Sequence, residues 1–201
     1  MHDVHRYFVL HKPYGMTSQF ISPHAGPLLG DLPYSFPEGT HAIGRLDKTS
    51  EGLLLLTTNK KVTGLLFQSK IPHRRTYRVQ VKHYMSEETL EQLRTGVPIL
   101  ISGKTFYTTP PCKVDMVPPS HFPSPRPISP LAKNTWLQLT ITEGKFRQVR
   151  KMVGAVRHPC LRLLRTSIED LELGNLPAGE VREVTEAEFF TQLKLGKAGD
   201  D

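Results

Sequence analysis

The sequence predicts an α+β protein whose core is a mostly antiparallel, mixed β-sheet with a few flanking helices. Three observations support this fold class: several short segments have strand patterns, the helical patterns between them are few and short, and the regular strand–helix–strand alternation of a parallel sheet is missing. The length of 201 residues allows one sizeable domain, or two small lobes that share a core.

The first part of the chain contains a strand that we expect at the centre of the sheet. Residues 7–10 form a short apolar run, which a Pro and a Gly within residues 12–15 close as a turn. The segment 22–40 is rich in Pro and Gly and is expected to be mostly loop. Residues 52–58 are apolar on both faces, which is typical of a strand covered on both sides. Asn59 can cap the short helix that follows.

The middle of the chain combines a strand, a helix and a proline-rich segment. Residues 76–81 alternate between apolar and polar side chains, which predicts a half-buried strand. A helix over residues 86–94 begins with Ser86 as its N-cap. The segment 118–133 contains six prolines and is predicted to be an extended surface excursion, not a domain boundary.

The last part of the chain predicts further strands and two helices. Residues 136–142 alternate again, and a helix over residues 146–156 follows, with apolar residues on one face and basic residues on the other. Residues 161–164 and 181–184 predict two more strands. A Thr-x-x-Glu capping box from residue 185 opens a C-terminal helix.

The charge of the chain indicates a polyanionic partner. Lys and Arg exceed Asp and Glu by 26 − 19 = 7 residues, and the isoelectric point is near 9.5. Such an excess favours nucleic acid. Seven basic residues and one acid fall between positions 143 and 165. This basic cluster is also compatible with a solvated helix face.

Several other classes of protein are disfavoured. No run approaches the roughly 18 apolar residues of a membrane span, and the first 15 residues lack the apolar core of a secretory signal. The nine histidines and two cysteines form no metal-ligand pattern. Phosphate-binding glycine loops and serine-hydrolase signatures are missing. We therefore expect a cytoplasmic protein with no metal, nucleotide cofactor or membrane partner, and a monomer because no coiled-coil seam is present.

Asp47 is the polar residue whose position most needs a physical reason. It ends the sequence Gly44-Arg-Leu-Asp47 and shortly precedes the apolar strand. Its carboxylate should therefore lie at the rim of the core. A partly dry carboxylate needs a partner, and Arg150 on the basic helix face is the candidate. The alternative is a polar turn in which Asp47 binds backbone groups and Arg45 is solvated or paired.

Tyr77 has two interpretations. As an inward residue of an alternating strand, it is a core aromatic. Arg74 and Arg75 stand close to it in the sequence, however, and an aromatic face beside phosphate-binding groups is typical of base stacking.

Three motifs, in this order, resemble the RsuA-like family of pseudouridine synthases. They are Ile43-Gly-Arg-Leu-Asp-Lys-Thr-Ser-Glu-Gly-Leu-Leu-Leu-Leu-Thr57, Thr76-Tyr-Arg-Val79 and Glu143-Gly-Lys-Phe-Arg-Gln-Val-Arg-Lys-Met152. The opening Val9-Leu-His-Lys-Pro-Tyr-Gly15 and the closing Leu176-Pro-Ala-Gly-Glu-Val-Arg-Glu-Val-Thr185 are similar as well. The resemblance covers about residues 7–188. It implies the pseudouridine synthase fold, with residues 1–201 as a single catalytic domain. This domain can consist of two sub-lobes with the active-site cleft between them.

The resemblance also implies an activity, the isomerisation of a specific uridine in structured ribosomal RNA to pseudouridine. The N-glycosidic bond is cleaved, the uracil turns within the pocket, and it is rejoined through C5, so no cofactor is needed. The catalytic Asp of the family corresponds to Asp47. Whether it adds to the sugar C1′ or abstracts a proton from C2′ stays open at this point.

The resemblance assigns roles to the other site residues. Tyr77 would pack on the flipped base and help to remove the C5 proton, and Arg150 would hold Asp47 ionised. Arg45 would bind the RNA backbone or hold the pocket open around the extruded nucleotide. The remaining predicted RNA contacts are Lys12, Arg74, Arg75, Lys145, Arg147, Lys151, Arg162 and Arg165.

The chain is most similar to the RluE type within this family, which modifies one uridine of large-subunit (23S) ribosomal RNA. Many relatives carry a small N-terminal RNA-binding domain of the S4 type, and none is expected here because the catalytic core begins near residue 7. Target recognition is then assigned to residues 22–40 and 118–133. Two alternatives stay open: a catalytically silent RNA-binding or ribosome-assembly protein, and a glycosidase that releases uracil. The latter usually needs two carboxylates, and Asp47 has only Glu51 nearby.

Overall fold

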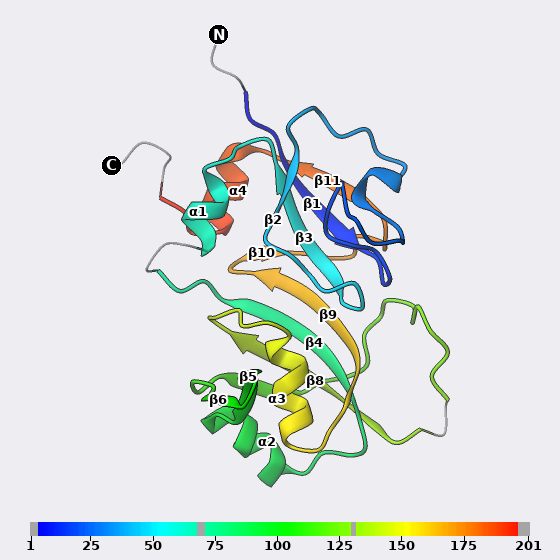
Figure 1. Cartoon of the computed structure of the whole chain (residues 1–201), viewed down its shortest axis with the longest axis vertical. Helices are drawn as coiled ribbons and strands as arrows, with labels where there is room; N and C mark the ends of the chain where they lie inside the picture. The colour runs from blue at the N-terminus through cyan, green and yellow to red at the C-terminus, as the bar shows by residue number, and fades with distance from the viewer. Residues whose placement is uncertain (1–3, 68–70, 130–131, 197–201) are drawn as a thin grey trace. The chain divides into compact units, whose positions relative to one another are not determined.

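A computed structural model gives the structure of residues 4–67, 71–129 and 132–196. It is an α+β protein, as predicted, with the strands and helices drawn in Figure 1. The chain divides into two compact units: Met1–His73 with Arg165–Asp201, and Arg74–Leu164. We call them the first and the second unit. Each has its own hydrophobic core.

The first unit is built around a fully buried strand. Its strands are β1 (Tyr7–Lys12), β2 (His41–Ile43), β3 (Glu51–Thr57), β10 (Leu171–Glu172) and β11 (Val181–Val184), and β9 (Cys160–Ile168) has its last residues here. β1 lies between β3 and β11 and is antiparallel to both. β2 also pairs with β3, and β10 pairs with the end of β9. All residues of β3 are buried, which confirms the prediction of a strand covered on both sides.

Local capping signals set the helices of the first unit. These are α1 (Val62–Phe67), α4 (Glu186–Gln192) and a short 3₁₀ helix, η1 (Leu29–Asp31). The Asn59 side chain accepts the N–H of Lys61 at 3.1 Å before α1. The Thr185 hydroxyl accepts the N–H of Glu188 at 3.1 Å, so the predicted cap of α4 is confirmed.

The segment 22–40 is mostly loop, as predicted, yet it is packed against the sheet. Leu29 and Leu32 are buried with Phe8 and other side chains of β1 and β3. The rings of Tyr34 and Phe36 lie 5.9 and 5.7 Å from the ring of Phe8 and meet it edge to face. Such aromatic contacts hold a chain without regular secondary structure in place.

The second unit contains three antiparallel strands and a separate hairpin. Its elements are β4 (Arg75–Lys82), α2 (Glu87–Thr95), β5 (Pro98–Ser102), β6 (Thr105–Thr108), β7 (Lys113–Met116), β8 (Asn134–Ile141) and α3 (Gln148–Ala155). β8 lies between β4 and β7 and is antiparallel to both. β5 and β6 form a two-stranded sheet of their own. The hairpin and β7 were not predicted, because few residues of these strands are buried and they lack a clear apolar pattern.

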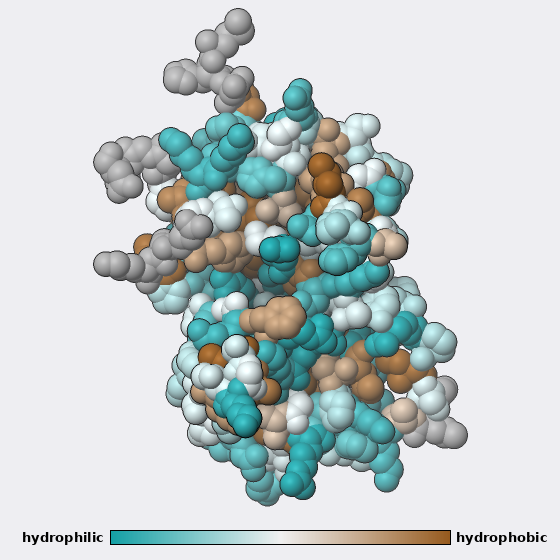
Figure 2. All heavy atoms as spheres, in the orientation of Figure 1, coloured by the Kyte–Doolittle hydropathy of each residue, from teal (hydrophilic) through white to brown (hydrophobic). Residues whose placement is uncertain are grey.

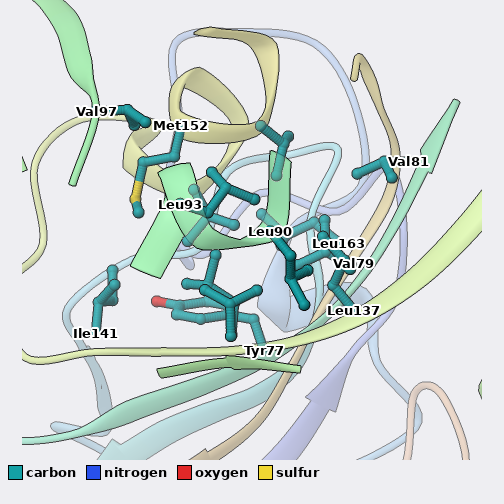
Figure 3. Close-up of a cluster of buried hydrophobic side chains, with 14 of the residues drawn as sticks. Tyr77, Val79, Val81, Leu90, Leu93, Val97, Leu137, Ile141, Met152 and Leu163 are labelled. Atoms are coloured by element: carbon teal, nitrogen blue, oxygen red, sulfur yellow. The ribbon is translucent and has the colours of Figure 1, made fainter. Parts of the chain in front are cut away.

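Helices α2 and α3 supply much of the core of the second unit. Figure 3 shows Leu90 and Leu93 of α2 and Met152 of α3 directed toward side chains of β4 and β8, among them Tyr77. The predicted N-cap of α2 is confirmed, since the Ser86 hydroxyl accepts the N–H of Thr89. The apolar face predicted for α3 is buried as well.

Helix α3 begins at residue 148, two residues later than predicted. Arg147, its N-cap, has φ 53°, which is left-handed backbone and therefore cannot continue a right-handed helix toward the N-terminus.

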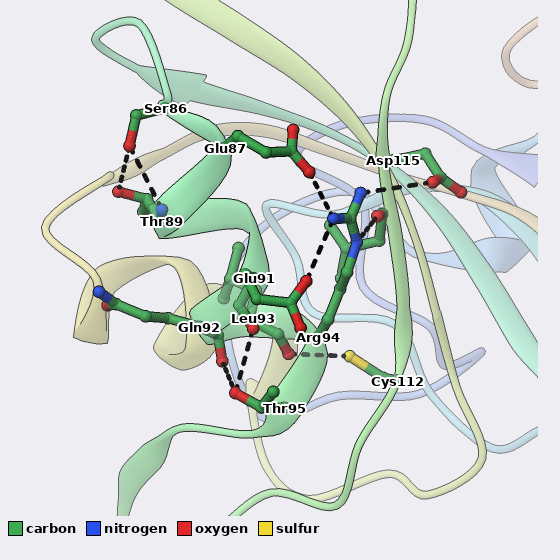
Figure 4. Close-up of polar contacts among 11 residues, drawn as sticks. Ser86, Glu87, Thr89, Glu91, Gln92, Leu93, Arg94, Thr95, Cys112 and Asp115 are labelled. Atoms are coloured by element: carbon green, nitrogen blue, oxygen red, sulfur yellow. Dashed lines mark hydrogen bonds and ion pairs between the residues drawn. The ribbon is translucent and has the colours of Figure 1, made fainter.

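Arg94 links α2 to strand β7 through hydrogen bonds and ion pairs. Its Nε donates to the carbonyl of Val114 at 2.9 Å, and its guanidinium also lies near the carboxylates of Glu87, Glu91 and Asp115 (Figure 4). One cation thus joins the solvent side of the helix to the neighbouring strand.

The described part of the chain lacks two kinds of feature. None of its helices is long and apolar enough to cross a membrane. Among the same residues, no group of three or more His, Cys, Asp or Glu side chains is arranged to hold a metal ion. On the face shown in Figure 2, hydrophobic residues form separate patches between hydrophilic ones.

Candidate active site

Asp47 lies in the turn between β2 and β3 of the first unit. Its carbonyl accepts the N–H of Ser50 at 2.9 Å, which closes the turn just before the buried strand. Asp47 is partly exposed and Arg45 is exposed. The carboxylate therefore lies at the rim of the core, where the sequence places it.

The residue before Asp47 anchors the turn. Leu46 is buried among side chains that include Phe8 and Leu54. The Ser18 hydroxyl accepts the N–H of Leu46 at 3.0 Å and donates to its carbonyl at 2.8 Å. Ser18 is buried and was not singled out from the sequence, where a lone serine carries no signal for such a contact. Because the N–H and the carbonyl of Leu46 are both bound, the backbone has little freedom here. The backbone of Asp47, the next residue, is therefore held in position.

The residue after Asp47 is held as well. The carbonyl of Lys48 accepts the N–H of Gly15 at 2.8 Å, and the Lys48 ammonium donates to the carbonyl of Ala25 at 3.2 Å. These contacts join the turn to the loop after β1 and to the segment 22–40. The turn that carries Asp47 is thus supported from both sides.

Lys12 is fully buried beside this turn. Its ammonium donates to the carbonyls of Pro13 and Met16, at 2.9 and 2.7 Å. Burial lowers the pKa of Lys12 to about 7, while the charges of Glu51 and Asp47 act in the opposite direction. The Lys12 ammonium therefore lies inside the loop that follows β1 and binds its carbonyls. This position disfavours the predicted contact with an RNA phosphate.

Arg165 is a second buried cation of the first unit. Its Nε donates to the carbonyl of Leu53 at 2.8 Å, and its charge contributes to the lowered pKa of Lys12. Asp47 also acts on that pKa, so Lys12 has both Asp47 and Arg165 as electrostatic neighbours.

The close approach of β3 to Arg165 depends on Gly52. This residue has φ +100°, and a Cβ placed on it would lie 2.2 Å from the Arg165 carbonyl oxygen. No side chain fits there, which gives a physical reason for the glycine in this strand.

The other two predicted catalytic residues belong to the second unit. Tyr77 is 8% exposed and lies in the core of that unit, as its position in an alternating strand predicts. Arg150 is half-buried on α3, with Nη1 3.5 Å from the Cys160 sulfur. The pairing of Arg150 with Asp47 and the packing of Tyr77 on a base stay predictions.

The predicted RNA contacts fall into two groups. Arg45, Arg74, Lys145 and Arg147 are exposed and Lys151 is half-buried. By contrast, Lys12, Arg75, Arg162 and Arg165 are at most 9% exposed. Buried cations that bind backbone carbonyls have a structural role, so the exposed group is better placed for phosphates.

Arg162 shows this structural role most clearly. Its guanidinium donates to the carbonyls of Phe122 and Pro123, at 2.9 and 3.0 Å, and lies over the ring of Trp136. The described residues of the segment 118–133 form no helix or strand, as predicted, but this arginine fixes them to β9.

Comparisons with known proteins show which family the chain resembles. A family model described as "RNA pseudouridylate synthase" matches residues 6–155, more than half of the chain. The ribosomal large subunit pseudouridine synthase E of Vibrio parahaemolyticus is 37% identical over 88% of this chain and 72% of its own length. The protein of the same name from Xanthomonas axonopodis is 38% identical over 84% of this chain and 88% of its own length.

A solved structure supports the same likeness. A crystal structure of a pseudouridylate synthase matches with a TM-score of 0.75 and 27% identity, over 94% of this chain and 74% of the other. The three motifs noted in the sequence lie within the residues matched by the family model.

Proposed function

The chain belongs to the family of RNA pseudouridylate synthases, and from this premise we propose that it isomerises a specific uridine of large-subunit ribosomal RNA to pseudouridine. The substrate class follows the names of the relatives from Vibrio and Xanthomonas. We propose that residues 1–201 act as a single catalytic domain and as a monomer, in the cytoplasm, on a uridine flipped out of its helix.

Asp47 is the proposed catalyst, and the anchored turn is the observation that supports it. The neighbours of Asp47 on both sides are tied down, by Ser18 at Leu46 and by Gly15 at Lys48. Such a turn can hold a carboxylate in one geometry before the substrate arrives, which lowers the entropic part of the barrier. Lys12 is an electrostatic neighbour of the Asp47 carboxylate within the same unit.

The proposed reaction breaks the bond between uracil N1 and C1′ and forms a bond between C5 and C1′. Asp47 either adds to C1′ and is later displaced, or removes a C2′ proton and later returns it. In both cases the C5 proton leaves the base and N1 gains a proton, so the product is an isomer. The proposed role of Tyr77 is to pack on the base and assist at C5, and that of Arg150 is to hold Asp47 ionised.

The experiment that tests the proposal replaces Asp47 by Asn. Release of tritium from C5-labelled uridine in a 23S ribosomal RNA transcript measures turnover, and a 16S transcript tests the subunit assignment. Asp47→Asn should abolish release while RNA affinity changes less than several-fold, and Glu172→Gln, at an exposed position of β10 in the same unit, should behave as wild type.

Two results would contradict the proposal. Retained turnover in Asp47→Asn would exclude this residue as the catalyst. A wild-type protein that binds ribosomal RNA yet leaves every uridine unchanged would instead favour the silent RNA-binding alternative, and free uracil among the products would favour the glycosidase.

A further inference from the structure

Phe146 is an exposed aromatic residue in the loop that leads into α3. Its side chain is 73% exposed, although a phenyl ring is more stable when it is buried. Single exposed apolar residues are common on protein surfaces and need no explanation by themselves. Two further features distinguish this one: hydrogen bonds hold the loop, and basic residues flank Phe146, one of them over its ring.

The loop is held by its own side chains. The Gln148 side-chain oxygen accepts the N–H of Lys145 at 2.9 Å, and the Gln148 amide nitrogen donates to the carboxylate of Glu143. That carboxylate also accepts the hydroxyl of Tyr107 at 2.7 Å, from strand β6. The buried Gln148 thus fixes both ends of the segment that contains Phe146.

The backbone at Arg147 adds to this rigidity. Its left-handed conformation, with φ 53°, separates the loop from α3 and leaves the preceding Phe146 outside the helix. This region is unfavourable for a residue other than glycine, so the surrounding contacts must hold Arg147 there. The backbone that carries Phe146 is therefore held in place.

Basic residues gather at this loop, and one of them contacts the Phe146 ring. The Lys151 ammonium is 5.4 Å from the centre of the Phe146 ring, and the Lys145 ammonium lies 4.5 Å from the centre of the Tyr107 ring. The exposed Arg147 follows Phe146 directly. The acid of this loop, Glu143, accepts hydrogen bonds from Tyr107 and Gln148.

We propose that Phe146 is a stacking platform for an unpaired base of the substrate RNA, with Lys145, Arg147 and Lys151 binding the phosphates on either side. A rigid aromatic face among positive charges is the combination that binds single-stranded RNA, because every base has a π-face and every linkage a negative charge. This inference rests on the proposed function, since it names how the same protein holds its RNA.

The test compares Phe146→Ala with Phe146→Tyr and with Phe106→Ala. Phe106, on β6, is 68% exposed, so it is a matched aromatic outside this loop. Loss of stacking should raise the Kd for the 23S transcript on the order of ten-fold in Phe146→Ala, whereas Phe146→Tyr and Phe106→Ala should stay within about two-fold of wild type. An unchanged Kd in Phe146→Ala would overturn the proposal.

The salt dependence of binding separates stacking from charge. Phe146→Ala should leave the slope of log Kd against log salt unchanged, because no phosphate contact is lost. Lys151→Gln should reduce the slope by about 0.7 for one contact to a single strand. If Phe146→Ala also changed the slope, it would be acting through the cations, and the stacking role would be wrong.

A spectroscopic measurement reports stacking directly. The variant Phe146→Trp should lose much of its added fluorescence when the RNA is saturating, whereas Phe106→Trp should not, with the native Trp136 as the background in both. Turnover of the wild type is measured in parallel. A wild type that forms pseudouridine, together with unquenched added fluorescence in Phe146→Trp, would refute the platform alone and leave the proposed function intact.

Discussion

The Ser18 hydroxyl is bound to both polar groups of the Leu46 backbone, accepting its N–H at 3.0 Å and donating to its carbonyl at 2.8 Å. The two residues are 28 positions apart in the sequence, and both are buried. One small side chain therefore connects the loop after β1 to the turn that carries Asp47. The position of the proposed catalyst depends on a residue that has no chemical part in the reaction.

Replacing Ser18 by Ala should lower both stability and activity. The change leaves the buried N–H and carbonyl of Leu46 without their partner, which costs about 1–3 kcal/mol of unfolding free energy. Because the turn loses its anchor, kcat should fall more than KM rises. Urea unfolding and single-turnover rates measure the two effects. Ser102→Ala, at an exposed position of β5, is the control, and equal behaviour of the two variants would argue against the anchoring role.

Replacing Gly52 by Ala should be more damaging than an ordinary glycine substitution. The new Cβ would lie 2.2 Å from the Arg165 carbonyl oxygen at φ +100°, so β3 must move away from Arg165. Strain together with a displaced backbone should cost roughly 3 kcal/mol or more. Gly39→Ala separates the two causes, since Gly39 has φ +80° and open space around it. It should cost only about 1 kcal/mol. Similar costs for both variants, measured by thermal unfolding, would show that the contact with Arg165 is unimportant.

Lys12 should make stability depend on pH above neutrality. Burial lowers the pKa of Lys12 from 10.5 to about 7, whereas the unfolded chain keeps the ordinary value. Between these two pH values the unfolded state binds more protons than the folded state, so the contribution of Lys12 to the unfolding free energy rises with pH. Below about pH 7 both states are protonated and the contribution is constant.

The Lys12→Met variant tests this dependence. From about pH 7 to about pH 9 the wild type should gain stability relative to the variant, on the order of 1 kcal/mol per pH unit. The comparison isolates Lys12, because the rest of the chain is the same in both proteins. Lys60→Met, at an exposed position, should show no such trend. A difference between wild type and Lys12→Met that does not change with pH would contradict the lowered pKa.

Local patterns predicted much of the fold because they depend on neighbouring residues. The uniformly apolar β3, the two faces of α3, and the caps at Ser86 and Thr185 are all encoded within a few positions of the sequence. The position of Asp47 at the rim of the core follows from the same local information, since it shortly precedes β3.

Other features depend on residues distant in the sequence and could not be predicted. A lysine or arginine in a sequence indicates a surface position, yet Lys12, Arg162 and Arg165 are buried because carbonyls of distant or irregular segments accept their hydrogen bonds. The contact of Ser18 with Leu46 could not be predicted either, because the two residues are 28 positions apart in the sequence. The hairpin of β5 and β6 was not predicted, because few residues of its two strands are buried.

Arg162 gives a last prediction, about the proline-rich segment. Its planar guanidinium reaches the carbonyls of Phe122 and Pro123 with two separate nitrogens. A lysine carries a single ammonium on a flexible stem and cannot reproduce this fork, so Arg162→Lys keeps the charge but loses the geometry. We expect the segment 118–129 to detach more often from β9 in this variant, since proline-rich chain has little secondary structure to hold it.

A protease of broad specificity measures this detachment, because cleavage requires the chain to leave the surface. Arg162→Lys should be cut within residues 118–129 several-fold faster than wild type, under conditions where global unfolding is negligible. Arg157→Lys is the matched control, since Arg157 is exposed and lies in the connection between α3 and β9. Equal cleavage rates in the two variants would mean that other contacts, such as that of Arg126 with the Leu161 carbonyl, are sufficient to hold the segment. If the segment also recognises the RNA target, the Arg162→Lys variant should bind the 23S transcript more weakly while Asp47-dependent turnover of bound RNA is preserved.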